Sequence, residues 1–397
     1  MDILSLYQEY NGFHNAKDKR ELIINPRERK KTVLFHYTRL NNFYNIIKTD
    51  GLWATHARFS NDDEELRYID KEIPKDKEIN IPEEYYIVSL CDDDDLLSQW
   101  RGYCGEDEGV AIGFDLGIVQ YFYLHSKLQE KQPDSSPFFN IANKVFYEYK
   151  EVSDYYEQFV KEGDYNIAYK MLKPYAKHPK FREEREYRLA VVNVDGQFDN
   201  YIRYRPSAGR ETPFIEIKFG NPKNNICSCN IRLNIKKDSE DKLFDALDDG
   251  IKYRIIKCRK STDTLRYGRH NDSNCYGCSM KRYVMGDYCN YGDDYVSIDI
   301  SKNIIHISEG NDQKDVFLKV SQIVDEINRN TKEIDKITIW CEGHLPIRKI
   351  CVGNTRRKDE LKESIKHYCQ HNNEQYWLKY VEIANSDIPY RTPLNFN

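Results

Sequence analysis

Two glutamates and an arginine at alternate positions are the residues of this sequence best suited to chemistry. Residues 183–192 are predicted to form a β-strand, because Tyr187, Leu189 and Val191 alternate with Glu186, Arg188 and Ala190. Such a strand carries Glu184, Glu186 and Arg188 on one face. On such a face, the two carboxylates and the guanidinium can point together into a cleft. The alternative is that they form exposed ion pairs with neighbouring arginines, each contributing less than about 1 kcal/mol.

A histidine at the end of a predicted strand is the second candidate. Residues 33–35 form a β-prone apolar run, His36 follows, and apolar residues then recur at helical spacing until Gly51, which is expected to end the helix. A histidine there can present one ring nitrogen to a ligand hydroxyl while the backbone fixes the other nitrogen. Thr38 can cap the helix. The alternative is that His36 only completes the end of the strand.

Short motifs follow one another along roughly the first 220 residues. In chain order they are His36-Tyr37-Thr38, Phe59-Ser60-Asn61-Asp62 with Glu64 or Glu65, Trp100-Arg101-Gly102-Tyr103, Gly109-Val110-Ala111-Ile112-Gly113-Phe114, and Glu184-Arg185-Glu186-Tyr187-Arg188. Their order resembles a bacterial domain-of-unknown-function family, number 2971, except that Ser60 is inserted in the second motif. The first motif, with the helix that follows it, also resembles the start of DNA-targeting ADP-ribosyltransferase toxins and, more loosely, of diphtheria-toxin-like enzymes.

The resemblance implies an α+β fold: an ADP-ribosyltransferase-like split mixed β-sheet core with a helical insertion, plus a smaller α/β C-terminal part. It also implies that residues 1–225 bind NAD as a co-substrate, with His36 holding the NAD ribose. Glu186 would be the catalytic carboxylate, because cleavage of the nicotinamide bond builds positive charge on the ribose. Glu184 is the alternative, since the strand register is fixed only to within two residues.

Such a site also needs aromatic walls that hold the nicotinamide. Trp53 falls where diphtheria-like enzymes carry their first nicotinamide-stacking Tyr, with Tyr68 near the second, although Trp departs from that pattern. Trp100 and Tyr103 share a helical face and form the rival wall, in which Tyr103 would be a catalytic residue. Trp53 and Trp100 could instead be core anchors. The other residues expected to bind NAD are Tyr37, Thr38, Arg58, Asn61, Arg101 and Arg188. Among these, Arg58 and Arg101 suit the diphosphate, because a planar cation binds it bidentately.

The rest of the chain is predicted to carry these residues as follows. Residues 226–335 are interpreted as an insertion that contains a cysteine cluster, and residues 336–397 as a C-terminal strand–helix–strand segment. The insertion is inferred from two similar strand–helix–strand segments, a repeat that could also be accidental. Residues 116–178 are predicted to be mostly helical. The acidic turn at residues 92–95 is interpreted as a solvated helix start and not as a site for a divalent ion.

Composition and cysteine content favour a cytoplasmic protein. The 397 residues carry a net charge of −5, contain no run of about 18 apolar residues, and begin without a signal-peptide pattern, so no membrane contact is expected. The eleven cysteines are expected to be reduced thiols, and no metal site is predicted. The alternative is a zinc site, because Cys275 and Cys278 have zinc-knuckle spacing. Its other ligands would come from Cys227, Cys229, Cys289 and His270.

Other enzyme classes leave no signature. The sequence has no Gly-rich phosphate loop, no Gly-x-Ser-x-Gly elbow and no His-Glu-x-x-His helix. The resemblance therefore favours an ADP-ribosyltransferase that uses NAD to modify a macromolecule, with RNA or DNA preferred over protein. It would act as a toxin or phage-defence effector, with an antitoxin or a phage-derived trigger as its partner. The alternatives are a non-catalytic nucleotide-binding sensor module and an NAD glycohydrolase.

Overall fold

The computed structural model forms two compact units. The first consists of Met1–Gly220, Lys349–His367 and Glu382–Asn397, and the second of Asn221–Arg348 and Tyr368–Val381. The residues that the structure describes are 33–59, 66, 83–104, 108–116, 121–125, 138–139, 142–148, 150–153, 173–194, 196, 198–207, 209–220, 228–235, 255–257, 264–268, 270–271, 284–285, 295–299, 304–308, 317, 321, 325, 334–341, 343–353, 355, 357–372 and 374–388.

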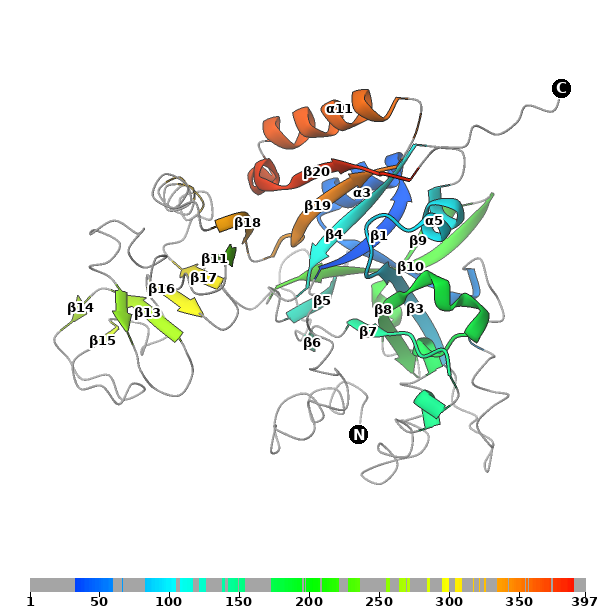
Figure 1. Cartoon of the computed structure of the whole chain (residues 1–397). Helices are drawn as coiled ribbons and strands as arrows, with labels where there is room; N and C mark the ends of the chain where they lie inside the picture. Colours follow the sequence, from blue (N-terminus) through cyan, green and yellow to red (C-terminus); the bar gives the residue numbers. More distant parts are fainter. Residues whose placement is uncertain are drawn as a thin grey trace. The chain divides into compact units, whose positions relative to one another are not determined.

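The first unit is built on one mixed sheet, which holds twelve strands of the described residues (Figure 1). The main path runs β20–β19–β4–β1–β3–β2–β10–β5–β6, while β8 pairs with β3 and β7, and β9 pairs with β10. The strand bounds are β1 Val33–Arg39, β2 Leu52–His56, β3 Glu83–Cys91, β4 Gly109–Asp115, β5 Tyr121–His125, β6 Phe138–Phe139, β7 Ala142–Lys144, β8 Glu186–Val194, β9 Ile202–Ser207, β10 Arg210–Phe219, β19 Ile347–Val352 and β20 Glu382–Asn385. Strands β19 and β20 are parallel, whereas pairs such as β1 with β4 are antiparallel. The predicted α+β class with a mixed sheet is confirmed.

Strand β3 divides this sheet into two branches. Along one edge, β3 pairs with β8 over its whole length, from Glu83 to Cys91. Along its other edge, Cys91 pairs with β1, while Tyr86 and Ile87 pair with β2. The sheet therefore continues from β3 as a β1–β4–β19–β20 branch and a separate branch that starts with β2 and β10. His36 of β1 lies next to the point where the branches separate.

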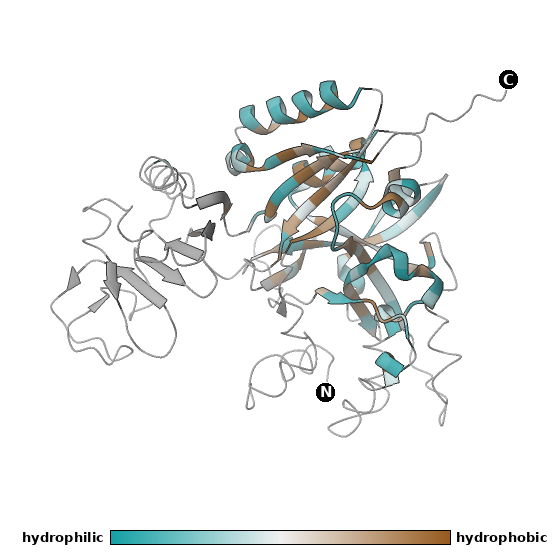
Figure 2. Cartoon of the chain, viewed as in Figure 1, coloured by the Kyte–Doolittle hydropathy of each residue, from teal (hydrophilic) through white to brown (hydrophobic). Residues whose placement is uncertain are grey.

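Few helices accompany the sheet. The α-helices with described bounds are α3 Leu40–Thr49, α5 Leu97–Gln99 and α11 Lys358–His371, and residues 150–153 are also helical. The 3₁₀ helices are η2 Ala57–Phe59, η6 Lys173–Tyr175, η7 Pro179–Glu184, η8 Asp199–Tyr201 and η11 Tyr376–Tyr380, and η4 Trp100–Cys104 is a π-helix. Helix α3 packs against β1 and β4, and every residue of β4 is buried. Figure 2 shows the resulting contrast between the apolar strands and the mostly hydrophilic α11.

The predicted ends of helix α3 are wrong at both termini. Its N-cap is Arg39, and the Thr38 hydroxyl accepts a hydrogen bond from the Asn42 amide at 3.2 Å instead of capping the helix. At the other end, Asp50 and not Gly51 takes the left-handed conformation, with φ 54°. Gly51 serves a close approach, since a Cβ there would lie 3.1 Å from a carboxylate oxygen of Glu216.

The acidic turn at residues 92–95 is not a solvated helix start, because ion pairs from distant strands hold it. Arg185, just before β8, contacts Asp92 and Asp93, each at 2.6 Å. Lys349 of β19 contacts Asp94 at 2.5 Å. These ion pairs satisfy the adjacent carboxylates that a sequence pattern shows only as a charged run.

The prediction that residues 116–178 are mostly helical is also wrong where the structure describes them. This stretch contributes β5, β6 and β7, and its described helical residues are confined to short turns. In β5, Phe122 and Leu124 are buried, and the strand pairs with β10 from Phe219 to Glu216. A short apolar run can form a strand or a buried helix, and β10, which decides between them here, lies far along the chain.

The second unit contains a six-stranded sheet with the order β12–β13–β16–β17–β11–β18, counted over the described residues. The bounds are β11 Ser228–Ile235, β12 Ile255–Lys257, β13 Thr264–Gly268, β16 Tyr295–Asp299, β17 Ile304–Ser308 and β18 Ile334–Cys341. A separate pair consists of β14 His270–Asn271 and β15 Val284–Met285. Residues of the predicted C-terminal segment contribute to both units.

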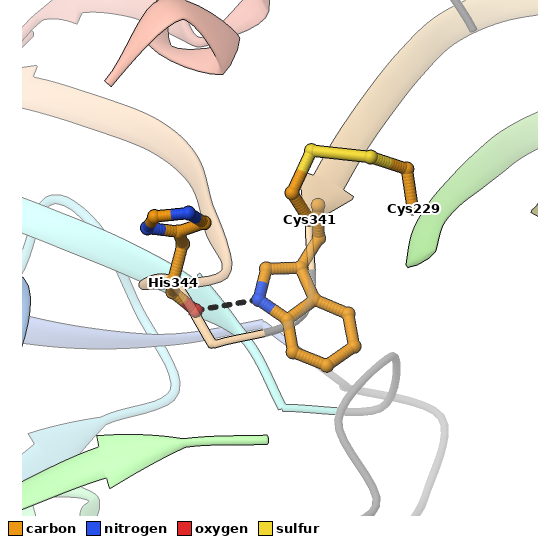
Figure 3. Close-up of a disulfide and its surroundings, with 4 residues drawn as sticks. Cys229, Cys341 and His344 are labelled. Carbon is orange, nitrogen blue, oxygen red and sulfur yellow. Dashed lines mark hydrogen bonds between the residues drawn. A yellow bond between two sulfur atoms is a disulfide. The ribbon is translucent and has the colours of Figure 1, made fainter. Parts of the chain in front are cut away.

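A disulfide within the second unit corrects the expectation that all cysteines are reduced. Cys229 and Cys341 are register partners on β11 and β18, and a disulfide joins them (Figure 3). Their Cα atoms are 4.1 Å apart, so adjacent strands bring them within bonding reach. Beside them, the indole nitrogen of Trp340 donates to the His344 carbonyl at 2.5 Å.

Among the described residues, no helix is both long enough and apolar enough to span a membrane.

Candidate functional site

His36 is fixed by a backbone carbonyl across the split in the sheet. Its Nδ1 lies 3.0 Å from the Ser89 carbonyl oxygen on β3. Since a carbonyl only accepts, Nδ1 carries the hydrogen and Nε2 becomes the acceptor in that tautomer. Burial lowers the pKa of His36, and the positive charge of Arg205 lowers it further, although the bond to Ser89 acts in the opposite direction. The half-buried ring is therefore a neutral hydrogen-bond acceptor at neutral pH.

Glu186 meets the same serine from the other edge of β3. The Ser89 hydroxyl donates a hydrogen bond to the Glu186 carboxylate, while the Ser89 carbonyl accepts from His36. Glu186 is the first residue of β8, and β8 pairs with β3 so that Ser89 faces Arg188. Ser89 thus connects the two residues predicted to hold and cleave the ligand.

The Glu186 carboxylate is buried between two cations. Arg188 Nε and Nη2 donate to its two oxygens at 2.8 and 2.9 Å, as the alternating strand pattern predicts for one face. Lys177 Nζ donates to it at 3.2 Å. Burial raises the pKa of Glu186, but the charges of Arg188 and Lys177 outweigh burial and lower it to about 2. Glu186 is therefore an anion throughout the physiological pH range.

Glu184 reaches this ion cluster from outside the strand. The predicted strand begins three residues too early, because η7 ends at Glu184 and Arg185 adopts a left-handed conformation with φ 50°. The Glu184 carboxylate still contacts Lys177 Nζ at 2.7 Å. Lys177 therefore joins Glu184 to Glu186, although the two do not share a strand face.

Trp53 belongs to a second group of side chains beside His36. Its ring lies 4.9 Å from that of Phe214, centroid to centroid, on the neighbouring strand β10. The Arg205 guanidinium lies 5.2 Å from the Trp53 ring centroid and donates to Thr55 Oγ1 at 2.9 Å. Thr55 pairs with Ile87 on β3, two residues before Ser89, so this group lies near the split. The charge of Arg205 also lowers the pKa of His36.

Trp100 and Tyr103 lie in a different environment. Trp100 is 9% exposed and packs in a cluster with Tyr37, Cys104 and Cys351, against which the half-buried Tyr103 also packs. The π-helix η4 places both side chains on this cluster. For Trp100, these contacts are those of a core anchor, the alternative that the sequence left open.

The remaining predicted residues are spread over the unit. Thr38 is buried and bonded to Asn42. Arg58 is exposed in η2, where its backbone nitrogen donates to His56 Nδ1 at 3.1 Å, and Arg101 is exposed in η4. Asn61 and Tyr68 lie outside the described residues.

Sequence reasoning missed Ser89, Lys177 and Arg205. Neither Ser89 nor Lys177, which precedes the charged strand, lies in a sequence pattern that pointed to it. Arg205 had a local signal, because Arg203 and Arg205 occupy alternate positions, as residues on one face of a strand do. Only the pairing of β9 with β10 shows that Arg205 lies near Trp53.

In the described part of the chain, no group of three or more His, Cys, Asp or Glu side chains is placed to hold a metal ion. Cys229 is bound to Cys341 and cannot serve as a thiolate ligand. The other predicted zinc ligands are outside the described residues, except for His270, whose backbone alone is described.

Comparison with known proteins identifies one stretch of the chain. No curated protein and no solved structure matches the chain. Residues 99–189 match the model of a family described as "Protein of unknown function (DUF2971)". The matched stretch begins directly before Trp100 and contains Glu184, Glu186 and Arg188, three residues of the site. Over this stretch, which is less than half of the chain, the sequence is similar to family DUF2971.

Proposed function

We propose that this protein is an ADP-ribosyltransferase that uses NAD to modify a macromolecule, with RNA or DNA as the favoured acceptor. The observation that carries the proposal is the convergence of His36 and Glu186 on Ser89, where the sheet divides. It combines a neutral hydrogen-bond acceptor with a permanent anion, held by one residue of the central strand.

The chemistry assigns a separate task to each group. The bond between ribose C1′ and nicotinamide breaks, a bond from C1′ to an acceptor oxygen or nitrogen forms, and the acceptor loses a proton. His36 Nε2 accepts a hydrogen bond from a ribose hydroxyl, and Trp53 provides a flat apolar wall. Glu186 opposes the positive charge that develops on the ribose.

The low pKa of Glu186 limits its role. A carboxylate with a pKa of about 2 is a weak base at neutral pH, so it is poorly suited to remove the proton of the acceptor. Glu186 therefore acts through its charge and its hydrogen bonds. The acceptor proton leaves to solvent or to a base on the acceptor side.

This proposal extends to the cellular role that the family resemblance suggests. A nucleic-acid-modifying transferase made continuously would poison its own cell. An antitoxin, or activation by a phage-derived trigger, would prevent this. We therefore propose a toxin or phage-defence effector that acts in the cytoplasm.

Labelled NAD tests the proposal directly. Purified protein is incubated with NAD labelled in the ADP-ribose part and a cell lysate, and the products are treated with nuclease or protease. Nuclease-sensitive label is the expected result for the wild type, and His36→Gln and Glu186→Gln should abolish it. His367→Gln and Glu363→Gln, matched changes on exposed residues of α11, should keep it. Absence of label from the wild type, or full labelling by folded His36→Gln and Glu186→Gln, would refute the assignment.

A non-catalytic nucleotide-binding module is the second candidate, and one observation favours it. Both oxygens of the Glu186 carboxylate already accept hydrogen bonds from Arg188, and Lys177 and Ser89 bind it as well. If these contacts persist with ligand, NAD should raise the melting temperature while no nicotinamide is released. Nicotinamide release without macromolecular label would instead indicate an NAD glycohydrolase.

A further inference from the structure

Arg205 is a half-buried arginine with no carboxylate partner within the described part of the chain. Its Nη2 donates to the neutral Thr55 hydroxyl at 2.9 Å, and burial lowers its pKa without an anion to raise it. Arg203, two residues earlier on β9, is paired with Glu216 at 2.5 Å. Removing a guanidinium from water without a counter-ion is costly. Arg205 is thus suited to receive an anion from outside the chain.

The hydrogen-bond donors around Arg205 would suit a ligand that carries several acceptor atoms. Among the described residues, Arg205 Nε and Trp53 Nε1 are both buried donors without a hydrogen-bond partner. The Arg205 guanidinium lies 5.2 Å from the Trp53 ring centroid and 5.7 Å from that of Phe214, so two aromatic rings flank it. Neighbouring donors that lack acceptors are best satisfied by a group with several anionic oxygens.

We propose that Arg205, Trp53 and Thr55 form a binding site for the diphosphate group of a nucleotide. A planar guanidinium binds phosphate oxygens bidentately, and the contacts of Arg205 with Thr55 and Trp53 already restrain its side chain before a ligand binds. The site lies near His36, because Thr55 pairs with Ile87 on β3, two residues before Ser89, whose carbonyl binds the His36 ring. In NAD, the diphosphate is bonded directly to the ribose that His36 is proposed to hold. Naming NAD as the nucleotide rests on the proposed function, whereas the anion site itself does not.

This assignment differs from the one that the sequence motifs favour. Arg58 and Arg101 were the arginines expected to bind the diphosphate, and both are exposed. An exposed guanidinium gains little from an ion pair, because water and salt screen it. Arg205 has the lower dielectric surroundings and the fixed orientation that strong anion binding requires.

Calorimetric titration of the full chain with ADP-ribose, and with adenosine as the phosphate-free probe, tests the site. The variants are Arg205→Met, which removes the charge, and Arg205→Lys, which keeps the charge without the planar fork. Arg210→Met is the matched control, because it removes the same charge from an exposed arginine. Arg210 is on β10, the partner of β9, and its guanidinium lies over the ring of Phe59. Circular dichroism and melting curves establish that each variant is folded.

The wild type should bind ADP-ribose more tightly than adenosine. Arg205→Met should weaken ADP-ribose binding by about 10- to 100-fold, the range expected for losing a charged hydrogen-bonded pair, and Arg205→Lys by about tenfold. Arg210→Met should stay within about twofold of the wild type. Wild-type affinity in either Arg205 variant would overturn the proposal. So would a wild type that prefers adenosine, or that binds neither probe. If Arg205→Met is unfolded, Arg205→Lys decides the outcome.

Nicotinamide release, measured on the same samples, separates this site from the proposed transferase. Binding of ADP-ribose that depends on Arg205, without any NAD cleavage by the wild type, supports the diphosphate site and refutes the transferase. Cleavage of NAD with unchanged ADP-ribose affinity in Arg205→Met refutes the diphosphate site and leaves the transferase standing.

Discussion

The rings of Tyr37 and Trp100 meet edge to face, with centroids 4.7 Å apart and planes at 77°. Their polar atoms hold the same acidic turn. The Tyr37 hydroxyl donates to the Asp93 carbonyl at 2.8 Å, and Trp100 Nε1 donates to the Asp95 carboxylate at 2.8 Å. Asp95 also accepts from the Ser386 hydroxyl, which follows β20. Tyr37 and Trp100, from two motifs far apart in the sequence, therefore link β1 and the acidic turn to the end of β20.

Replacement of Trp100 by phenylalanine should destabilise the fold. It removes the hydrogen bond to Asp95 and part of the edge-to-face contact, so the free energy of unfolding should fall by about 1–3 kcal/mol. Urea titration followed by circular dichroism measures this change. Leu97→Ala, on an exposed residue of the neighbouring helix α5, should change stability by less than about 0.5 kcal/mol. Normal stability with lost nucleotide binding would place Trp100 in the ligand site instead.

Loss of Arg188 should be among the most damaging single changes in the first unit. Arg188→Met leaves the buried Glu186 with a single cation, Lys177, and breaking a buried ion pair costs about 3–5 kcal/mol. The matched control is Arg182→Met, because Arg182 pairs with Glu148 on the surface and should contribute at most about 1 kcal/mol. Chemical denaturation compares the two variants. Equal effects would mean that solvent reaches the Glu186 cluster.

Stability should decrease in acid because of His125. Burial, followed by the charges of Lys218 and Arg203, lowers the pKa of His125 to about 4 in the folded protein. The unfolded chain binds that proton near pH 6.5. Between these values the unfolded state holds more protons, so stability falls as pH drops from about 6.5 to 4. In His125→Gln, the melting temperature should therefore depend less on pH across this window.

Two other groups help to separate that effect. His36 also has a lowered pKa and contributes with the same sign, so His36→Gln should flatten the profile independently. Glu186, with a pKa of about 2, loses its contribution only below about pH 4.5. An unchanged slope in His125→Gln between pH 6.5 and 4 would show that His125 keeps an ordinary pKa in the folded protein.

The parts of this site that sequence predicts are those fixed by local periodicity. Alternation along β8 places Glu186 and Arg188 on one face, and the apolar run before His36 forms β1. Ser89, Lys177 and Arg205 act through contacts between distant segments, which no single-sequence pattern encodes. The same physical reason explains the wrong helical prediction after residue 116, because pairing with β10 decides it.

The end of helix α3 gives a prediction in which two adjacent residues respond in opposite ways. Asp50 adopts φ 54°, a conformation that costs roughly 1 kcal/mol for most residues but not for glycine. Asp50→Gly should therefore stabilise the fold by up to about 1 kcal/mol. Burial raises the pKa of Glu216, and the charge of Asp50 raises it further, which indicates repulsion between the two carboxylates. Asp50→Asn removes only this charge, so it reports how much of the gain comes from relief of that repulsion.

Gly51→Ala should instead destabilise the fold. The added methyl group would lie 3.1 Å from a Glu216 carboxylate oxygen and from the Ile217 carbonyl, so β2 and β10 must separate slightly. Such overpacking typically costs about 1–3 kcal/mol. Thermal melts of both single variants and of the double variant test the pair. If Gly51→Ala left the stability unchanged, β10 would have room for a methyl group beside the helix end, and the close approach would not require glycine at this position.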